Sequence, residues 1–291
     1  MDLRPIGLWT FQVDTQPVSL GRELAAEIEN LGYGALWLPE AAGRDAVVSA
    51  TLLLGATQRL TLGTGVVPLY AREPPILNAA WKTLEDAYPG RFVLGIGVSH
   101  APLVEGILGS DYGPPLATMR SYLERMDAAP FFAAPPPRPP RRVLAALGPK
   151  MLALAAERAD GALTYNCTPE HTAAARPVMG EKMLAVEQKV ALTSDPTEAR
   201  DIARNTLRIY TGLPNYVNNW LRLGFGGDEI SGLADRFVDA VVAWGDDDAL
   251  RARVQAHLDA GADHVCVQVL SRDGKIPVED WRRLAPVLVR R

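Results

Sequence analysis

The chain has 291 residues, 48% of them hydrophobic, enough for one large α/β domain of about 250 residues or for two smaller domains. Its net charge is −4 and acidic and basic residues are interspersed, so we expect no nucleic acid and no anionic membrane surface as a partner. No apolar run reaches the roughly 18 residues of a membrane helix and the N-terminus lacks a signal-peptide pattern, which predicts a cytoplasmic protein.

Short apolar runs alternate with amphipathic helical patterns along the chain. The runs predict eight strands, at Ile6–Phe11, Ala35–Pro39, Leu60–Val67, Phe92–Val98, Val143–Leu147, Ala162–Tyr165, Val190–Leu192 and His264–Leu270. Predicted helices cover Ser19–Leu31, with Ser19 as cap and Gly32 as stop, Asp45–Thr57 and Pro75–Tyr88. Further helices begin at Pro149, after Thr168, after Asp195 and behind the last strand.

This order predicts a parallel α/β sheet, because parallel neighbours need a crossover connection between them. The continuous Val, Leu and Ile runs agree, since strands covered on both faces are apolar throughout. Eight strands, and no dinucleotide glycine fingerprint in Gln12–Val18, favour a closed (β/α)8 TIM barrel over an open Rossmann sheet.

Two segments interrupt the alternation. Residues 130–142 are rich in proline, which predicts a stiff, extended connector; recognition by a proline-binding module is a minor alternative. Leu213–Gly224 predicts an extra helix between strands seven and eight, with aromatic and amide side chains that could cover a pocket.

Polar or glycine residues end several of the predicted strands. In barrel enzymes the active site lies at the carboxyl ends of the strands. This places one group of residues around a common opening: Glu40, the Gly65-Val66-Val67-Pro68 turn, Ser99 and His100, Gly148-Pro149-Lys150, and Tyr165 with Asn166.

Most of these residues also have a simpler explanation. Glu40 could only cap the following turn, and a lone histidine such as His100 is often structural, although two strand glycines before it favour a pocket position. We expect His171 and His257 on the surface, because they lie in helical patterns. His264 begins the last strand at the opposite end of the barrel, where a role in stability is expected.

The turn before Pro149 is the best candidate for an anion site. A glycine ahead of a helix that starts with proline exposes free N–H groups at the positive end of the helix dipole. Lys150 would add a positive charge there, or point to solvent in an ordinary strand–helix turn.

Known metal and nucleophile motifs are missing from the sequence. There is no His-x-His, no His-Glu-x-x-His, no Gly-x-Ser-x-Gly and no Walker loop. The two cysteines, Cys167 and Cys266, have neither disulfide nor metal spacing and are expected to be small buried hydrophobes. Demanding chemistry would therefore need an organic cofactor.

Six segments together resemble the bacterial luciferase-like superfamily of flavin- and deazaflavin-dependent enzymes, and more closely its actinobacterial branch of coenzyme F420-dependent oxidoreductases. They are Glu29–Glu40, Gly63–Val67, Gly90–His100, Gly148–Met151, Ala159–Ala162 and Gly261–His264. The resemblance extends over nearly the whole chain and implies one luciferase-like TIM-barrel domain over residues 1–291.

The resemblance also implies a site. Strand three of such proteins ends in a bulge, often with a non-proline cis peptide, that supports the back of the cofactor ring, and Gly65, Val66 and Val67 occupy that place here. It puts Glu40, Ser99 and His100 near the ring, Gly148 and Pro149 near the cofactor phosphate, and Thr164, Tyr165 and Asn166 beside the tail. A homodimer through Asp45–Thr57 and Pro75–Tyr88 is expected as well.

The function that follows is hydride transfer between coenzyme F420 and a small organic substrate, with His100 as proton donor or acceptor and Glu40 in reserve. Lys150, and also Arg176, would meet the acidic tail of F420. An FMN-dependent monooxygenase on the same fold is the first alternative, and a non-catalytic ligand-binding barrel the second. A glycosidase would need two carboxylates at strand ends, and only Glu40 is placed for it.

Overall fold

The structure is a computed structural model that describes residues 3–272 and 274–289. Eight parallel strands form a closed ring, because β10 pairs with β1 on one edge and with β8 on the other. The predicted (β/α)8 TIM barrel is therefore confirmed. Its strands are β1 (Ile6–Trp9), β2 (Ala35–Leu38), β3 (Thr61–Thr64), β5 (Phe92–Gly97), β6 (Arg141–Ala145), β7 (Gly161–Thr164), β8 (Met183–Ala191) and β10 (His264–Val269).

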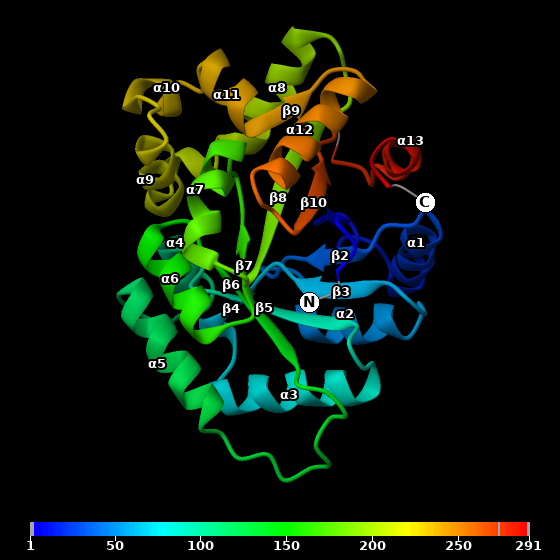
Figure 1. The fold of residues 1–291 in the computed structure, drawn as a ribbon, viewed down its shortest axis with the longest axis vertical. Coiled ribbons are helices and arrows are strands. Elements are labelled where there is room, and N and C mark those ends of the chain that lie inside the picture. Colours follow the sequence, from blue (N-terminus) through cyan, green and yellow to red (C-terminus); the bar gives the residue numbers. More distant parts are fainter. Residues whose placement is uncertain (1–2, 273, 290–291) are drawn as a thin grey trace.

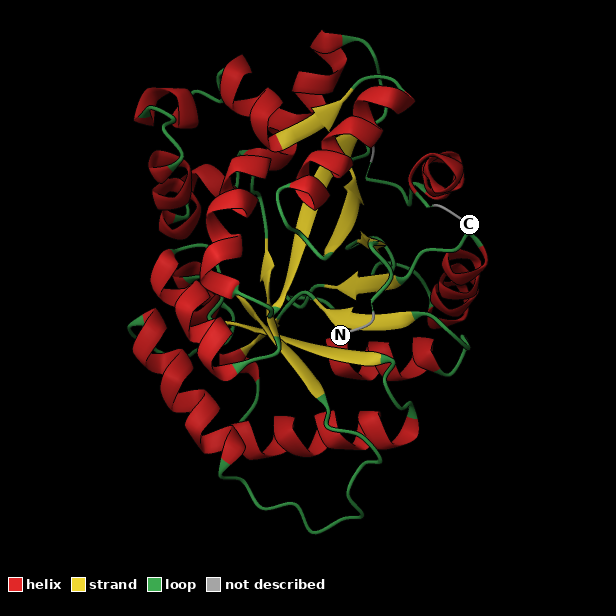
Figure 2. Cartoon of the chain, viewed as in Figure 1, coloured by secondary structure: helices red, strands yellow, loops and turns green. Residues whose placement is uncertain are grey.

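Helices surround the strands on the outside (Figures 1 and 2). After the first five strands of the ring come α1 (Val18–Asn30), α2 (Ala46–Leu54), α3 (Pro74–Ala87), α4 (Ala101–Gly106), α5 (Pro115–Asp127) and α6 (Pro149–Arg158). The remaining ones are α7 (Pro169–Met179), α8 (Pro196–Leu207), α9 (Pro214–Arg222), α10 (Gly227–Ser231), α11 (Asp235–Val241), α12 (Asp247–Asp259) and α13 (Val278–Leu288), with short turns η1 (Leu69–Ala71) and η2 (Tyr210–Gly212). None of the described helices is long and apolar enough to span a bilayer.

Side-chain caps explain where several helices begin. The carboxylates of Asp45 and Asp195 each accept two backbone N–H bonds in the first turn of α2 and α8, an arrangement that stabilises a helix by about 1 kcal/mol. The predicted cap at Ser19 is wrong, because α1 already begins at Val18 behind Pro17. Thr168 precedes α7 as expected, but its hydroxyl makes no cap hydrogen bond.

The seventh strand of the ring, β8, is longer than predicted. The sequence indicated Val190–Leu192, whereas β8 begins at Met183. Glu187 and Lys189 break the apolar run but lie fully buried, because they pair with each other. The long strand also holds an unpredicted partner: β9 (Val242–Trp244) pairs with the last residues of β8, on the edge that β7 occupies lower down.

The proline-rich connector ends two residues earlier than predicted. β6 begins at Arg141, so the irregular part covers residues 128–140, the long loop at the foot of Figure 1. Arg142 belongs to the strand and is buried, and its guanidinium pairs with Asp127 at the end of α5. The predicted extra helix is present as α9 and is joined by η2, α10 and α11.

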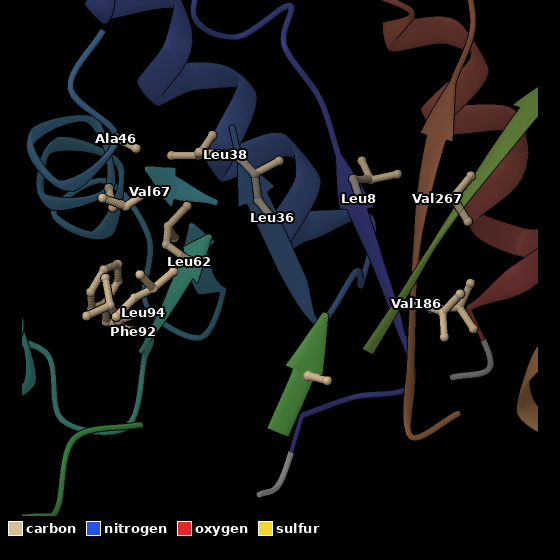
Figure 3. Close-up of a cluster of buried hydrophobic side chains, with 14 of the residues drawn as sticks. Leu8, Leu36, Leu38, Ala46, Leu62, Val67, Phe92, Leu94, Val186 and Val267 are labelled. Carbon is tan, nitrogen blue, oxygen red and sulfur yellow. The ribbon is translucent and has the colours of Figure 1, made fainter. Parts of the chain in front are cut away.

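The main core lies between the strands and the surrounding helices. Leu8, Leu36, Leu62 and Leu94 extend into it from β1, β2, β3 and β5 (Figure 3). A second apolar cluster, which includes Trp37, fills the barrel itself. Both cysteines are buried and unpaired, as expected.

The prediction that His171 and His257 lie on the surface is wrong. His171 Nε2 lies 2.9 Å from the Leu147 carbonyl oxygen. Both ring nitrogens of His257 have partners, in Thr172 and Gln188, so this histidine joins α12 to α7 and β8. A helical pattern alone did not show which face of α7 and α12 packs on the barrel.

Candidate active site

Two adjoining cavities open at the carboxyl ends of the strands, where barrel enzymes carry their active sites. The first has a volume of about 250 Å³ and reaches the ends of β1 and β2. The second has a volume of about 300 Å³ and reaches β6 and α6. The two cavities adjoin, because they share the lining residues Val66, Ser99, His100, Ala145, Leu163, Tyr165 and Tyr216.

A bulge between β3 and β4 (Val67–Pro68) forms part of the shared wall. Its Gly65–Val66 peptide bond is cis. Glycines of β5 make room for it: a Cβ at Gly95 would lie 1.9 Å from the Thr64 carbonyl oxygen, and one at Gly97 would lie 2.5 Å from Val66. Gly95 therefore admits the backbone of Thr64, and Gly97 admits the side chain of Val66, which lines both cavities.

The three residues predicted at the bulge do not all reach the cavities. Gly65 lines the first cavity and Val66 lines both. Val67 is fully buried in the main core and lines neither (Figure 3). Neighbouring residues of an extended segment point to opposite faces, which separates Val67 from Val66.

A row of touching rings, the aromatic belt, lines the first cavity. It consists of Phe11, Trp9, Tyr165, Tyr210 and Tyr216, with successive ring centroids 4.6, 5.0, 5.7 and 5.0 Å apart. Several polar groups of the belt already have hydrogen-bond partners within the protein. Trp9 Nε1 donates to the Gly65 carbonyl oxygen at 3.1 Å, and the Tyr165 hydroxyl contacts Tyr210 and donates to Gln268.

His100 stands at the junction of the two cavities, in the N-cap position of α4. Its ring lies 5.5 Å from that of Tyr216. Burial lowers the pKa of His100, and a hydrogen bond with Asn215 offsets part of that shift. The imidazole is therefore neutral at pH 7. Ser99 beside it has a φ of 58°, a left-handed conformation that is costly for a non-glycine residue and frequent at functional sites.

Glu40 lines the first cavity but is held by an ion pair. Both of its carboxylate oxygens accept from the Arg72 guanidinium, at 2.7 and 3.0 Å, and one also accepts from the Ala46 backbone N–H. Arg72 contacts the carboxylate of Asp45 as well. A carboxylate bound in this way is an anchor between β2 and α2 rather than a free base.

Positive groups gather at the far end of the second cavity. Gly148 lies there as the N-cap of α6, with no side chain capping the helix, and Arg222 of α9 lines the same space. A Cβ at Gly148 would lie 3.5 Å from the Arg222 guanidinium, so the helix N-terminus and the guanidinium border the same space. Pro149 and Lys150 are exposed and line neither cavity.

Of the three residues predicted beside the cofactor tail, Tyr165 alone lines the cavities. Thr164 is fully buried at the end of β7. Asn166 is buried too: its backbone N–H donates to Glu187 and its carbonyl oxygen accepts from Trp220. Neither residue lines the cavities.

A buried ion pair lies beneath the aromatic belt. Lys189 Nζ is 3.2 Å from both carboxylate oxygens of Glu187 and 3.6 Å from the centroid of the Tyr165 ring. Burial raises the pKa of Glu187 and lowers that of Lys189 to about 8. The Lys189 ammonium group of this pair supports the Tyr165 ring from below.

The prediction that Arg176 meets the acidic tail of the cofactor is wrong. Its guanidinium bonds to Asp263 and to the carbonyl oxygens of Gly261 and Lys182, at the opposite end of the barrel. Sequence reasoning had instead missed Arg222 and the Glu187–Lys189 pair. The amides and aromatics of the predicted extra helix were a signal for Arg222, and two charged residues alternating inside an apolar run were a signal for the pair.

The family of the chain follows from comparison with known proteins. Residues 5–264 match the sequence model of the luciferase-like monooxygenases, and the chain belongs to this family. A Mycobacterium tuberculosis protein with the provisional name of a coenzyme F420-dependent oxidoreductase is 33% identical over 56% of this chain and 55% of its own length. The chain thus spans about half the length of the curated relatives it matches first.

Solved structures share the fold at low sequence identity. An F420-dependent secondary alcohol dehydrogenase, in complex with an F420–acetone adduct, superimposes with a TM-score of 0.81 at 15% identity, over the full length of both chains. The oxygenating component of 3,6-diketocamphane monooxygenase from Pseudomonas putida, in complex with FMN, gives a TM-score of 0.66 at 17% identity, over 98% of this chain and 96% of its own.

Proposed function

We propose that this protein is a coenzyme F420-dependent oxidoreductase that transfers a hydride between the deazaflavin and a small organic substrate. The observation that carries the proposal is the pair of joined cavities, one bordered by aromatic rings and the other ending at a helix N-terminus and a guanidinium. The similarity to the mycobacterial relative supports F420 as the cofactor.

The residues of the second cavity fit a cofactor with a flat ring and an anionic tail. Val66 and Ala145 offer a smooth surface at the junction of the cavities. Gly148 leaves the N-terminus of α6 uncapped, and such a terminus favours a phosphate. Arg222 adds a fork of N–H donors suited to phosphate or carboxylate.

A bound deazaflavin would supply a hydride donor or acceptor and little chemistry with oxygen. His100 would hold or release the proton that accompanies the hydride, at a substrate oxygen in the first cavity. Phe11, Leu103 and Ile209 would keep water from this region, because they close its rim with apolar side chains.

A flavin-dependent monooxygenase on the same framework is the second candidate, favoured by the fold shared with an FMN-bound enzyme. FMN carries a ring and a phosphate like F420 but lacks the acidic tail beyond the phosphate. The Arg222 guanidinium could pair with the phosphate of either cofactor. In F420 it could also pair with the acidic tail, and this additional contact favours F420.

Titration of the cofactor-free full chain with F420 and with FMN, followed through tryptophan fluorescence, tests this choice. We expect F420 to bind at least tenfold more tightly than FMN. Arg222→Ala should weaken F420 binding at least tenfold, since a charge-assisted hydrogen bond contributes about 1.5–3 kcal/mol. Arg22→Ala, at an exposed position of α1, is the matched control. Tighter binding of FMN would favour the monooxygenase, and binding of neither would reject both enzymes.

We further propose that two copies of the chain associate through α2 and α3. Val48 and Leu52 of α2, and Ile76 of α3, are large apolar side chains with 57%, 40% and 65% of their surface exposed. The two helices follow adjacent strands of the ring and lie next to each other in Figure 1. Contact with a second copy would remove these side chains from water.

A further inference from the structure

The walls of the first cavity are apolar on most sides. The aromatic belt forms one wall, and Leu103, Leu163, Ile209 and Leu213 add aliphatic surface from four separate segments. Such walls favour a ligand with extensive hydrocarbon surface, since each buried methylene contributes about 0.8 kcal/mol.

No unpaired charge faces this cavity from the residues that the structure describes. Neither lysine nor arginine lines it, and its one carboxylate, that of Glu40, is bound by Arg72. Burial keeps His100 neutral at pH 7 and raises the pKa of Tyr165, of Tyr216 and of Tyr210. A charged ligand would thus lose its hydration without gaining a partner, which is strongly unfavourable.

Few polar groups remain for a ligand. The Trp9 indole N–H and the Tyr165 hydroxyl already have partners inside the protein. Ser99 and His100 lie together on the wall shared with the second cavity. Polar recognition is therefore concentrated at one point, beside the junction.

We propose that the first cavity binds an uncharged, largely apolar ligand with a single oxygen function, a carbonyl or the matching hydroxyl group, whose oxygen meets His100. That this ligand is the substrate rests on the proposed function, whereas its binding does not. The aromatic belt and Leu103 determine this specificity, because they exclude any second charged or strongly polar group.

Calorimetry with two matched ligands tests the proposal. 2-Octanone and 7-oxooctanoate differ only in a terminal methyl or carboxylate group, so they report the effect of one charge. Both are titrated into the full chain, without cofactor and after saturation with F420. We expect 2-octanone to bind at least tenfold more tightly in one or both states.

Leu103→Arg should reverse this preference, because it places a cation on the wall of the cavity. Phe11→Arg is a second variant, at the exposed rim, in case the first does not fold; circular dichroism reports folding for both. Phe132→Arg is the control, since Phe132 is 96% exposed in the loop before β6 and lines neither cavity. It should keep the preference of the unmodified chain.

The result separates this inference from the proposed function. Binding of 2-octanone with the expected preference, but no binding of F420, would retain the apolar site and reject the F420 enzyme. Binding of F420 with equal or tighter binding of 7-oxooctanoate would retain the cofactor and overturn the inference. Failure of both ketones to bind in either state would overturn it too.

Discussion

The four histidines of the chain differ in what their ring nitrogens contact. Burial lowers the pKa of each of them. His257 and His264 use both ring nitrogens for contacts within the protein, and His171 uses one. His100 alone lines the cavities, so it is the histidine placed to exchange a proton with a ligand.

His100→Ala should reduce turnover by about 10²–10⁴, with F420 affinity changed less than threefold, because general acid–base catalysis contributes this much. The pH profile gives an independent check. In the ketone-reducing direction the protonated imidazole is needed, so the rate should fall as pH rises through the lowered pKa, below about 6.5. In the alcohol-oxidising direction it should rise. Steady-state kinetics in both directions measure this, and an unchanged rate in the variant would remove His100 from the reaction.

At the scale of elements, β8 is unusual because it contains two charged residues, Glu187 and Lys189, inside the barrel. It places a carboxylate and an ammonium group in the barrel interior, both fully buried. Each charge is tolerated because the other lies 3.2 Å away and the Tyr165 ring covers the ammonium. The ion pair on this strand therefore both supports the Tyr165 ring in the candidate site and affects the stability of the barrel.

Lys189→Met should lower the free energy of unfolding by about 3–5 kcal/mol, because it leaves the Glu187 carboxylate buried without its partner. Urea denaturation at pH 7 measures the loss. The double variant Glu187→Gln with Lys189→Met should recover most of the stability, since no lone charge remains. If the double variant were as unstable as the single one, packing rather than charge would be the cause.

At the scale of the molecule, apolar side chains remain exposed on the helices next to the second and third strands. The combined substitution Val48→Glu with Ile76→Glu should convert a dimer to a monomer, because it would bury two like charges in the contact. Sedimentation velocity measures the change. Phe132→Glu, equally apolar and exposed but in the loop before β6, should leave the dimer intact. A monomeric unmodified chain at tens of micromolar would reject the proposed association.

The sequence was sufficient for the barrel because its strands are apolar on both faces and its helices begin at recognisable residues. It was insufficient for β8, where the partner of each charged residue is the other, a contact that only the barrel interior makes favourable. The role of Glu40 was equally hidden, because Arg72 comes from a later turn with no local pattern joining the two.

The candidate site was predicted in part for a similar reason. Strand ends identify residues such as Gly65, Ser99, His100 and Gly148, because the fold brings these ends together. Adjacent residues of an extended segment point to opposite faces, so Val66 lines the cavities whereas Val67 lies in the main core. Arg222 arrives from the segment between β8 and β9, whose path over the barrel the pattern does not specify.

The segment between β8 and β9 supplies Tyr210, Leu213 and Tyr216 to the apolar cavity and Arg222 to the positively charged end of the other. Under the proposed function, this segment therefore contributes both to the choice of ligand and to the choice of cofactor. An exchange of residues 208–241 between two relatives would alter both at once, while the eight strands beneath stayed as they were. Related proteins should therefore differ more in residues 208–241 than in the eight strands of the barrel.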